Sequence, residues 1–214
     1  MNKTNFKIID DNLYKKYKFN TEKMPGLFFD RDGVLIKEKN YIKMAHKVEL
    51  ESYSIKHLRS LLNHDFINII VTNQSGISRG LLNWDDYINV TNKMKNLMGN
   101  PNLFAGIYAN SLRDNNIGND FWRKPNPGMI LEAAKDFPID LSKSIIIGDK
   151  FSDLISGARA KISKVIHVLT GHGKEERKII EERFAKSCYE ESLKVPKLIL
   201  VDSLADVSSN LLLF

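Results

Sequence analysis

The chain has 214 residues, of which 43% are hydrophobic and 27% charged, so it has the length and composition of one globular domain with a buried core. Its apolar runs are too short to span a bilayer, and its N-terminus is unlike an export signal, so we expect no membrane contact. The single cysteine, Cys188, excludes internal disulfides and zinc sites built from several thiolates, so we expect a cytoplasmic protein. The net charge of +6 is spread along the chain, which suits phosphorylated small molecules and supports nucleic-acid binding only weakly.

Short apolar runs alternate with amphipathic stretches along the chain. Residues 1–24 are polar and lysine-rich with little periodicity, and we interpret them as an extension or loosely docked arm. Buried strands are predicted at 26–29, 66–72, 104–109, 144–147, 165–169 and 197–201. Helical spacing predicts helices at 54–63, 84–98, 127–137, 152–160, 174–186 and 203–212. The alternation predicts an α/β fold, in which a doubly wound, mostly parallel sheet carries helices on both faces.

The strand predicted at 26–29 ends in two carboxylates, Asp30 and Asp32, which Gly33 follows. Open α/β sheets bind ligands at this edge, and two carboxylates placed there can divide the work of phosphoryl transfer. One attacks phosphorus in line, while the other protonates the leaving oxygen and later activates water. Taken alone, the motif has a structural alternative, a polar loop that caps a helix.

Three further segments carry polar side chains that suit a phosphate ester. Thr72 and Asn73 end an apolar strand and begin a turn that offers hydroxyl and backbone N–H donors to phosphate oxygens. Lys124, between Arg123 and a proline, supplies a fixed cation that can balance phosphate charge. Asp149 follows another apolar strand and could complete a site of oxygen ligands for Mg²⁺. Singly, these segments could equally be helix caps, strand-ending turns or a basic surface loop.

Together the segments resemble the haloacid dehalogenase superfamily of phosphotransferases. The matching stretches are 30–33, 72–80, 123–129 and 148–153, and they look like the branch that contains D,D-heptose 1,7-bisphosphate phosphatase and histidinol-phosphate phosphatase. The resemblance runs from about residue 26 to the C-terminus and does not cover residues 1–24. It implies a Rossmann-like phosphatase domain over 25–214 with no large cap domain, preceded by an N-terminal extension over 1–24.

The resemblance also implies roles for the acidic residues. Asp30 is expected to be the nucleophile, and Asp32 the general acid and base. Mg²⁺ is expected to be held by Asp30, by the backbone carbonyl of Asp32 and by Asp149. Asp153 matches a second acidic position, where we expect support of the metal site rather than ligation.

For the phosphate, the resemblance implies that Thr72 and Asn73 hold the transferring group and that Lys124 neutralises it. Arg79 and Arg123 flank these motifs, and a guanidinium group suits anionic or hydroxylated parts of a substrate. We therefore expect these two arginines to bind the part of the substrate away from the reacting phosphorus. The alternative is that both are surface arginines.

A departure from the family pattern concerns zinc. Relatives often carry a zinc loop of cysteines and a histidine before the Arg-Lys-Pro segment, but here the positions read Ala109, Ser111, Asp120 and Trp122. These side chains cannot form a tetrahedral zinc site, so we expect a protein that needs Mg²⁺ and no zinc. Packing of Phe121 and Trp122 is expected to order the loop instead.

The expected function is hydrolysis of a small phosphorylated sugar, with heptose 1,7-bisphosphate as the best candidate and histidinol phosphate behind it. A nucleic-acid 3′-phosphatase is an alternative because that group shares the Thr-Asn-Gln and Arg-Lys-Pro segments, although no aromatic and basic stripe indicates strand binding. A phosphoaspartate receiver domain is the non-enzyme alternative. It is disfavoured because receivers do not place both carboxylates on the first core strand. We expect the protein to act as a monomer.

Overall fold

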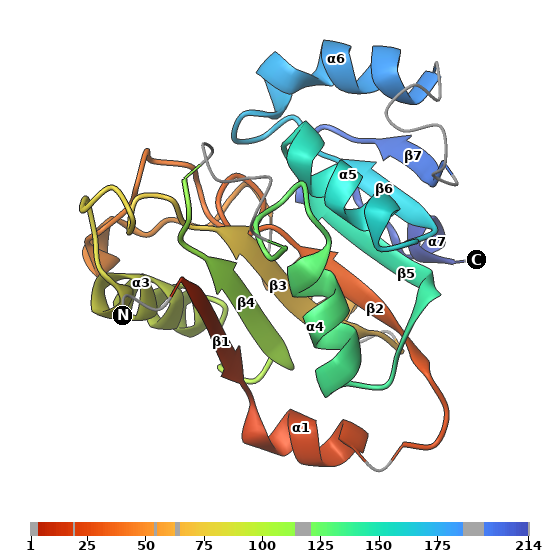
Figure 1. The fold of residues 1–214 in the computed structure, drawn as a ribbon, viewed down its shortest axis with the longest axis horizontal. Coiled ribbons are helices and arrows are strands. Elements are labelled where there is room, and N and C mark those ends of the chain that lie inside the picture. Colours follow the sequence, from red (N-terminus) through yellow and green to blue (C-terminus); the bar gives the residue numbers. More distant parts are fainter. Residues whose placement is uncertain are drawn as a thin grey trace.

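The computed structural model describes residues 4–18, 20–53, 55–62, 65–113, 121–185 and 195–213. Within these ranges seven strands form one sheet in the order β1-β4-β3-β2-β5-β6-β7 (Figure 1). The strands are β1 (Asn5–Ile9), β2 (Met24–Phe29), β3 (Ile67–Asn73), β4 (Gly106–Asn110), β5 (Ile139–Gly148), β6 (Lys164–His167) and β7 (Lys197–Leu200). All neighbours pair in parallel except β1, which runs antiparallel to β4. The predicted, mostly parallel sheet is confirmed.

Helices cover both faces of this sheet. They are α1 (Asp11–Lys18), α2 (Ile55–Leu62), α3 (Trp84–Leu97), α4 (Gly128–Asp136), α5 (Phe151–Arg159), α6 (Gly173–Ala185) and α7 (Ser209–Leu212). Leu27 and Phe29 of β2 belong to a core layer with α2 and α3, whereas Phe28 between them belongs to the layer with α4, α5 and α6. Alternate side chains of a strand point to opposite faces, so the two core layers follow from the pleat. The doubly wound α/β fold is therefore confirmed.

Two expectations about the chain ends were wrong. Residues 5–9 are not a loosely docked arm, because β1 pairs with β4 along its length and Lys7 Nζ lies 2.9 Å from Asp136 Oδ2. Residues 203–212 are not one helix but a 3₁₀ turn at Leu204–Asp206 followed by the four-residue α7. The reason lies at Ser203, whose backbone N–H donates to Asp206 Oδ2 at 2.9 Å and closes a capped turn. Short polar side chains that bond nearby backbone favour such turns over a continuing helix.

Some expectations fall outside the described residues, namely the helix ends at 54, 63 and 186 and the cysteine at 188. No helix within the described ranges is long and apolar enough to cross a bilayer.

The strand ends converge at one edge of the sheet. Phe29, the last residue of β2, is in register with Ile70 of β3 on one side and with Ile147 of β5 on the other. The residues that follow these strands therefore meet at the same edge. Between β2 and α2, the described connection holds two isolated bridges and the 3₁₀ turn Ala45–Lys47, and no separate cap domain.

Candidate active site

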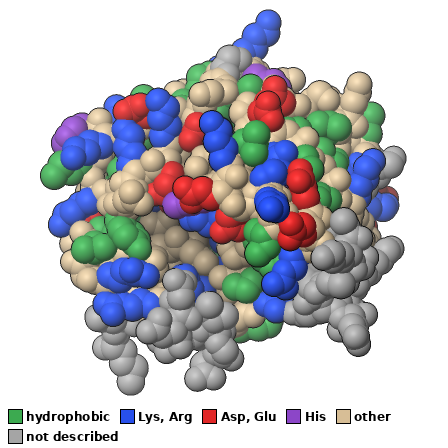
Figure 2. Space-filling model, turned by 90° about the horizontal axis from the view of Figure 1, so that it is seen from above, with side chains coloured by type: hydrophobic (Ala, Val, Ile, Leu, Met, Phe, Trp, Pro, Cys, Tyr) green, Lys and Arg blue, Asp and Glu red, His purple; other side chains and the backbone are tan. Residues whose placement is uncertain are grey.

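A cavity of about 440 Å³ lies at the carboxyl edge of the sheet. Figure 2 shows a hollow on this face, with acidic and basic side chains gathered around it. The predicted site residues among those that line the cavity are Asp30, Asp32, Asn73, Arg79, Arg123 and Lys124. Thr72 and Asp149 are buried and do not belong to that lining. The structure thus brings segments more than a hundred residues apart to one site.

Three buried carboxylates surround the floor of this cavity. Asp30, Asp149 and Asp153 each offer an oxygen atom, and these atoms all lie within 4.8 Å of one another. The ammonium group of Lys124 lies 3.0 Å from Asp30 Oδ1 and 2.7 Å from Asp153 Oδ1. It also donates a hydrogen bond to the carbonyl of Val71 at 2.9 Å. One fixed cation is therefore shared between the predicted nucleophile and Asp153 in the first turn of α5.

Burial and mutual repulsion dominate the electrostatics of this cluster. Burial raises the pKa of Asp149 well above its ordinary value, and the charges of Asp153 and Asp30 raise it further. Burial also raises the pKa of Asp153, although the ammonium group of Lys124 opposes the shift. Burial alone would lower the pKa of Lys124, but the charges of Asp153 and Asp30 raise it. Burial and repulsion thus outweigh the charges of Lys124 and Lys150, which favour the ionised carboxylates.

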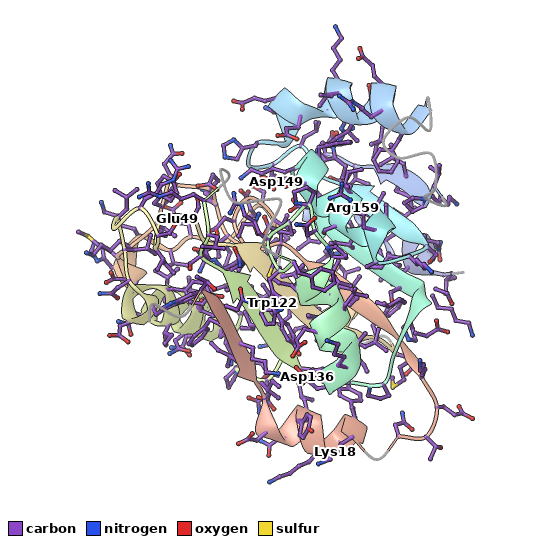
Figure 3. The ribbon with its side chains drawn as sticks, in the orientation of Figure 1. Lys18, Glu49, Trp122, Asp136, Asp149 and Arg159 are labelled. Carbon is purple, nitrogen blue, oxygen red and sulfur yellow. The ribbon has the colours of Figure 1, made fainter. Side chains whose placement is uncertain are left out.

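The donor set fits a magnesium ion. Asp149 Oδ2 accepts a hydrogen bond from the backbone N–H of His172 at 2.9 Å, whereas its Oδ1 is buried and has no hydrogen-bond partner among the described residues. Figure 3 shows Asp149 at the end of β5, beside the loop that leads into α6. Buried polar atoms without a partner are rare in folded proteins, and Mg²⁺ prefers carboxylate oxygens such as these. Among the described residues, Asp30, Asp149 and Asp153 bring three carboxylate oxygens close enough together to hold such an ion.

Asp32 lies outside that cluster, in a hydrogen-bond network of its own. Arg31 Nη2 donates to Asp32 Oδ2 at 2.9 Å, and Gln74 Nε2 donates to the same oxygen at 2.8 Å. Gln74 Nε2 also donates to Thr72 Oγ1 at 2.9 Å, while its Oε1 accepts from Arg31 Nη2 at 3.1 Å. The guanidinium group of Arg31 is buried over the ring of Tyr87, 4.9 Å from its centroid. These contacts fix the carboxylate of Asp32 at the cavity wall.

Sequence reasoning gave no role to Arg31 and Gln74. The only signal was their place inside the two motifs, because an arginine between two aspartates would ordinarily be expected to point to solvent. Their contacts join positions 43 and 60 residues apart, from Arg31 to Gln74 and to Thr91. Such contacts become visible only once the fold is known.

Asn73 and Lys124 hold each other through the backbone. Asn73 Nδ2 donates to the carbonyl of Lys124 at 3.0 Å, and the backbone N–H of Lys124 donates to Asn73 Oδ1 at 3.1 Å. Both ends of the Asn73 amide are used in this clamp, which fixes the start of the Arg-Lys-Pro segment. The Asn73 side chain thus positions Lys124, and its predicted contact with the transferring phosphate stays a prediction.

The two arginines predicted to bind the far end of a substrate both reach the cavity. Arg79 is exposed and lies over the ring of Tyr41, with its guanidinium carbon 5.6 Å from the centroid. Arg123 is buried and donates from Nη1 to the carbonyl of Leu112 at 2.5 Å. Burial lowers the pKa of Arg123, and the nearby charge of Arg79 lowers it further. Both guanidinium groups line the cavity, and such a pair suits an anion.

The positions of the relatives' zinc loop are used differently here. Ala109 is buried in β4, and Ser111 Oγ donates to the carbonyl of Thr4 at 3.2 Å. Trp122 packs near Tyr108, with ring centroids 6.0 Å apart, as its expected packing role requires. Phe121 does not share that role, because 55% of its surface is exposed. Position 120 lies outside the described residues.

Comparison with known proteins agrees with this geometry. The model of the family described as polynucleotide kinase 3 phosphatase matches residues 26–180. A D-glycero-alpha-D-manno-heptose-1,7-bisphosphate 7-phosphatase of Photorhabdus laumondii is 35% identical over 161 residues, which cover 70% of this chain and 85% of that protein. A D-glycero-beta-D-manno-heptose-1,7-bisphosphate 7-phosphatase of Pasteurella multocida is 32% identical over 184 residues, which cover 81% of this chain and 96% of that protein.

A solved structure shares the fold. The D,D-heptose 1,7-bisphosphate phosphatase of B. bronchiseptica, crystallised with magnesium and phosphate, matches with a TM-score of 0.71 at 24% identity. The match covers 88% of this chain and 98% of that one. A doubly wound sheet with paired aspartates after β2 and a lysine between buried carboxylates defines a phosphatase of the haloacid dehalogenase type. The chain belongs to the polynucleotide kinase 3 phosphatase family within that superfamily, so the resemblance is confirmed and the receiver alternative is set aside.

The electrostatics of the cluster predict the effect of replacing its lysine. Lys124→Met should cost about 3–5 kcal/mol of stability near neutral pH, because it leaves buried carboxylates without their cation. The pKa values of Asp149 and Asp153 are raised, so the folded protein binds more protons than the unfolded chain, and its stability falls as pH rises. The loss caused by Lys124→Met should therefore shrink as the pH is lowered towards about 4, where these carboxylates become protonated. Urea denaturation in metal-free buffer at several pH values measures this. Lys37→Met, at an exposed pair with Glu49, is the control. A loss no larger than that of the control would contradict the account.

Proposed function

We propose that this phosphatase hydrolyses a small sugar phosphate in a Mg²⁺-dependent reaction, through a phosphoryl group carried on Asp30. The substrate we propose is D-glycero-D-manno-heptose 1,7-bisphosphate. The observation that carries the proposal is the position of Asp30 at the cavity floor, 3.0 Å from the ammonium group of Lys124. The names of the relatives from Photorhabdus laumondii and Pasteurella multocida support the choice of substrate.

In the proposed mechanism Asp30 attacks phosphorus and the oxygen of the substrate leaves. Lys124 holds the Asp30 carboxylate in place and neutralises the charge that gathers on the phosphoryl oxygens. Asp32, held by Arg31 and Gln74 at the cavity wall, gives its proton to the leaving oxygen. It then takes a proton from water, which attacks phosphorus and releases phosphate and a free Asp30. Thr72, whose hydroxyl accepts from Gln74, is proposed to assist in holding the phosphate.

The metal would be held by Asp30 and Asp149, with the backbone carbonyl of Asp32 as a third ligand. When bound, Mg²⁺ supplies positive charge that stabilises phosphoryl oxygens and helps to orient the ester. Asp153 is proposed to support the site indirectly, because its Oδ1 lies 2.7 Å from Lys124 and its Oδ2 accepts from the backbone N–H of Lys150 at 3.0 Å. These contacts give Asp153 a role in orienting the lysine.

Two other substrates are candidates. The name of the matching family model favours a nucleic-acid 3′-phosphatase, which the net charge of +6 supports only weakly. The branch that the sequence motifs resemble also includes histidinol-phosphate phosphatase. Phosphate release should therefore be compared for heptose 1,7-bisphosphate, histidinol phosphate and a 3′-phosphorylated oligonucleotide at equal enzyme concentration. We expect the highest kcat/KM for the heptose bisphosphate. A higher value for the oligonucleotide, together with salt-sensitive binding, would replace the proposal with the nucleic-acid function.

We also propose that the protein works in the cytoplasm, which its single cysteine favours, and as a monomer, which a single compact domain favours. Its mass in solution, measured by light scattering with and without Mg²⁺, checks the second point. A dimeric mass would contradict it.

The roles of the paired aspartates predict two losses of activity. Asp30→Asn should lower kcat by about 10⁴-fold or more, because the amide lacks the nucleophilic oxygen and the charge that helps to hold Mg²⁺. Asp32→Asn should lower it by roughly 10²–10⁴-fold through the loss of proton transfer. Steady-state phosphate release with Mg²⁺ measures both, and Asp85→Asn on the exposed start of α3 is the control. Wild-type turnover by Asp30→Asn would show that the roles are wrongly assigned.

Arg79 and Arg123 are proposed to bind the second phosphate of a bisphosphate. Arg79→Ala and Arg123→Ala should each lower kcat/KM for the bisphosphate roughly tenfold to a hundredfold, the value of a charge-assisted hydrogen bond. An aryl phosphate has no second anion, so its hydrolysis should change only slightly. Arg183→Ala, an exposed position on α6, serves as the control. Equal losses on both substrates would point to a structural role or to contact with the reacting phosphate.

The protein is proposed to work without zinc. Ala109 and Trp122 have no ligand atom for zinc, and Ser111 already donates to Thr4. We expect metal analysis after purification without added metals to find far less than one zinc per chain. A zinc-selective chelator should leave the unfolding temperature and the Mg²⁺-dependent activity unchanged. Stoichiometric zinc, or a large loss of stability with the chelator, would refute this.

A further inference from the structure

A buried histidine lies directly behind the metal-facing aspartate. His167 is the last residue of β6 and has no exposed surface. Its Nε2 lies 2.9 Å from the backbone carbonyl oxygen of Asp149, and its Nδ1 lies 2.8 Å from Nε of Arg177 on α6. Arg177 reaches further and donates from Nη2 to the carbonyl of Val201 at 2.6 Å. A chain of hydrogen bonds thus runs from α6 through β6 to Asp149.

The arginine decides which ring nitrogen of His167 carries the proton. A guanidinium group only donates hydrogen bonds, so Nδ1 must accept from Arg177 and the proton of the neutral ring must lie on Nε2. In that tautomer Nε2 donates to the carbonyl oxygen of Asp149. Because Nδ1 accepts from Arg177, it carries no proton of its own, and the ring holds a single proton on Nε2. Without Arg177 the other tautomer becomes accessible, and it would turn a nitrogen lone pair towards that oxygen.

The hydrogen bond matters because Asp149 follows the last residue of β5 and so lies beyond the strand ladder. Its carboxylate sits in a tight space, where a Cβ atom added at Gly171 or Gly33 would come within 2.3 Å or 2.6 Å of Oδ2. The same Oδ2 accepts from the N–H of His172, which leaves Oδ1 for a ligand. A small rotation of the Asp149 peptide would therefore misdirect Oδ1.

We propose that His167 and Arg177 are positioning residues that set the direction of the Asp149 carboxylate and thereby the affinity for Mg²⁺. The inference rests on the proposed function only in taking Asp149 as a ligand of the ion. Removal of a residue that hydrogen-bonds a metal ligand typically weakens metal binding by about tenfold to a hundredfold, and we expect an effect of this size here.

The test measures binding of Mg²⁺ alone to the full chain after chelator treatment, by titration calorimetry, with the free energy of unfolding measured in parallel. His167→Leu fills a similar space but cannot donate, whereas His167→Gln can donate to Asp149 and accept from Arg177. Arg177→Met removes the donor to Nδ1 and so allows either tautomer, while His167 itself is unchanged. His57→Leu is the matched control, because Nε2 of His57 contacts the carbonyl of Leu204 instead.

We expect the Kd for Mg²⁺ to rise about tenfold or more in His167→Leu and Arg177→Met, to return close to the wild-type value in His167→Gln, and to stay unchanged in His57→Leu. If His167→Leu does not fold, Arg177→Met against the wild type decides the question. Wild-type affinity in a folded His167→Leu or in Arg177→Met would overturn the inference while leaving the metal site intact. If Asp149→Asn binds Mg²⁺ as the wild type does, the proposed metal site itself fails, and the inference with it.

Discussion

The site depends on the burial of three carboxylates around one lysine. Moving charges out of water costs several kcal/mol for each ion, and Asp30, Asp149 and Asp153 repel one another as well. Lys124 offsets part of this cost, and its own place is fixed by the Asn73 clamp and by the carbonyl of Val71. An excess of buried carboxylates over their cations suits the divalent cation that we propose the cluster to bind. In this proposal, the repulsion that destabilises the metal-free fold also contributes to the affinity for Mg²⁺.

The paired aspartates of the first motif lie in different environments although one residue separates them. Asp30 faces the buried carboxylates and Lys124, while Asp32 is half-buried at the cavity wall and accepts from Arg31 and Gln74. Different surroundings allow two similar groups to take different parts in one reaction. Arg31 between them is buried over Tyr87 and donates to Asp32, so the two carboxylates have different partners. The Asp-Arg-Asp-Gly motif thus supplies both aspartates and the arginine that binds the second of them.

Much of the fold could be predicted from the sequence because β-branched runs and helical spacing report burial directly. Strand β1 was missed because Asn5–Ile9 is short and acquires its role only through pairing with β4. The broken C-terminal helix was missed because the capped turn at Ser203 outweighs the apolar spacing that follows. In the site, the strand-end residues were predictable from their position. The contacts of Gln74, and the link from Arg177 through His167 to Asp149, join distant parts of the chain and required the structure.

The central claim is that Asp30 carries the phosphoryl group. Acid quenching of the enzyme during turnover, followed by mass spectrometry of its peptides, tests this most directly. The account predicts phosphate on the peptide that contains Asp30, and its loss when the quenched protein is treated with hydroxylamine, which cleaves acyl phosphates. Phosphate on another residue, or turnover with no phosphorylated peptide under conditions that trap the intermediate in a relative, would contradict it.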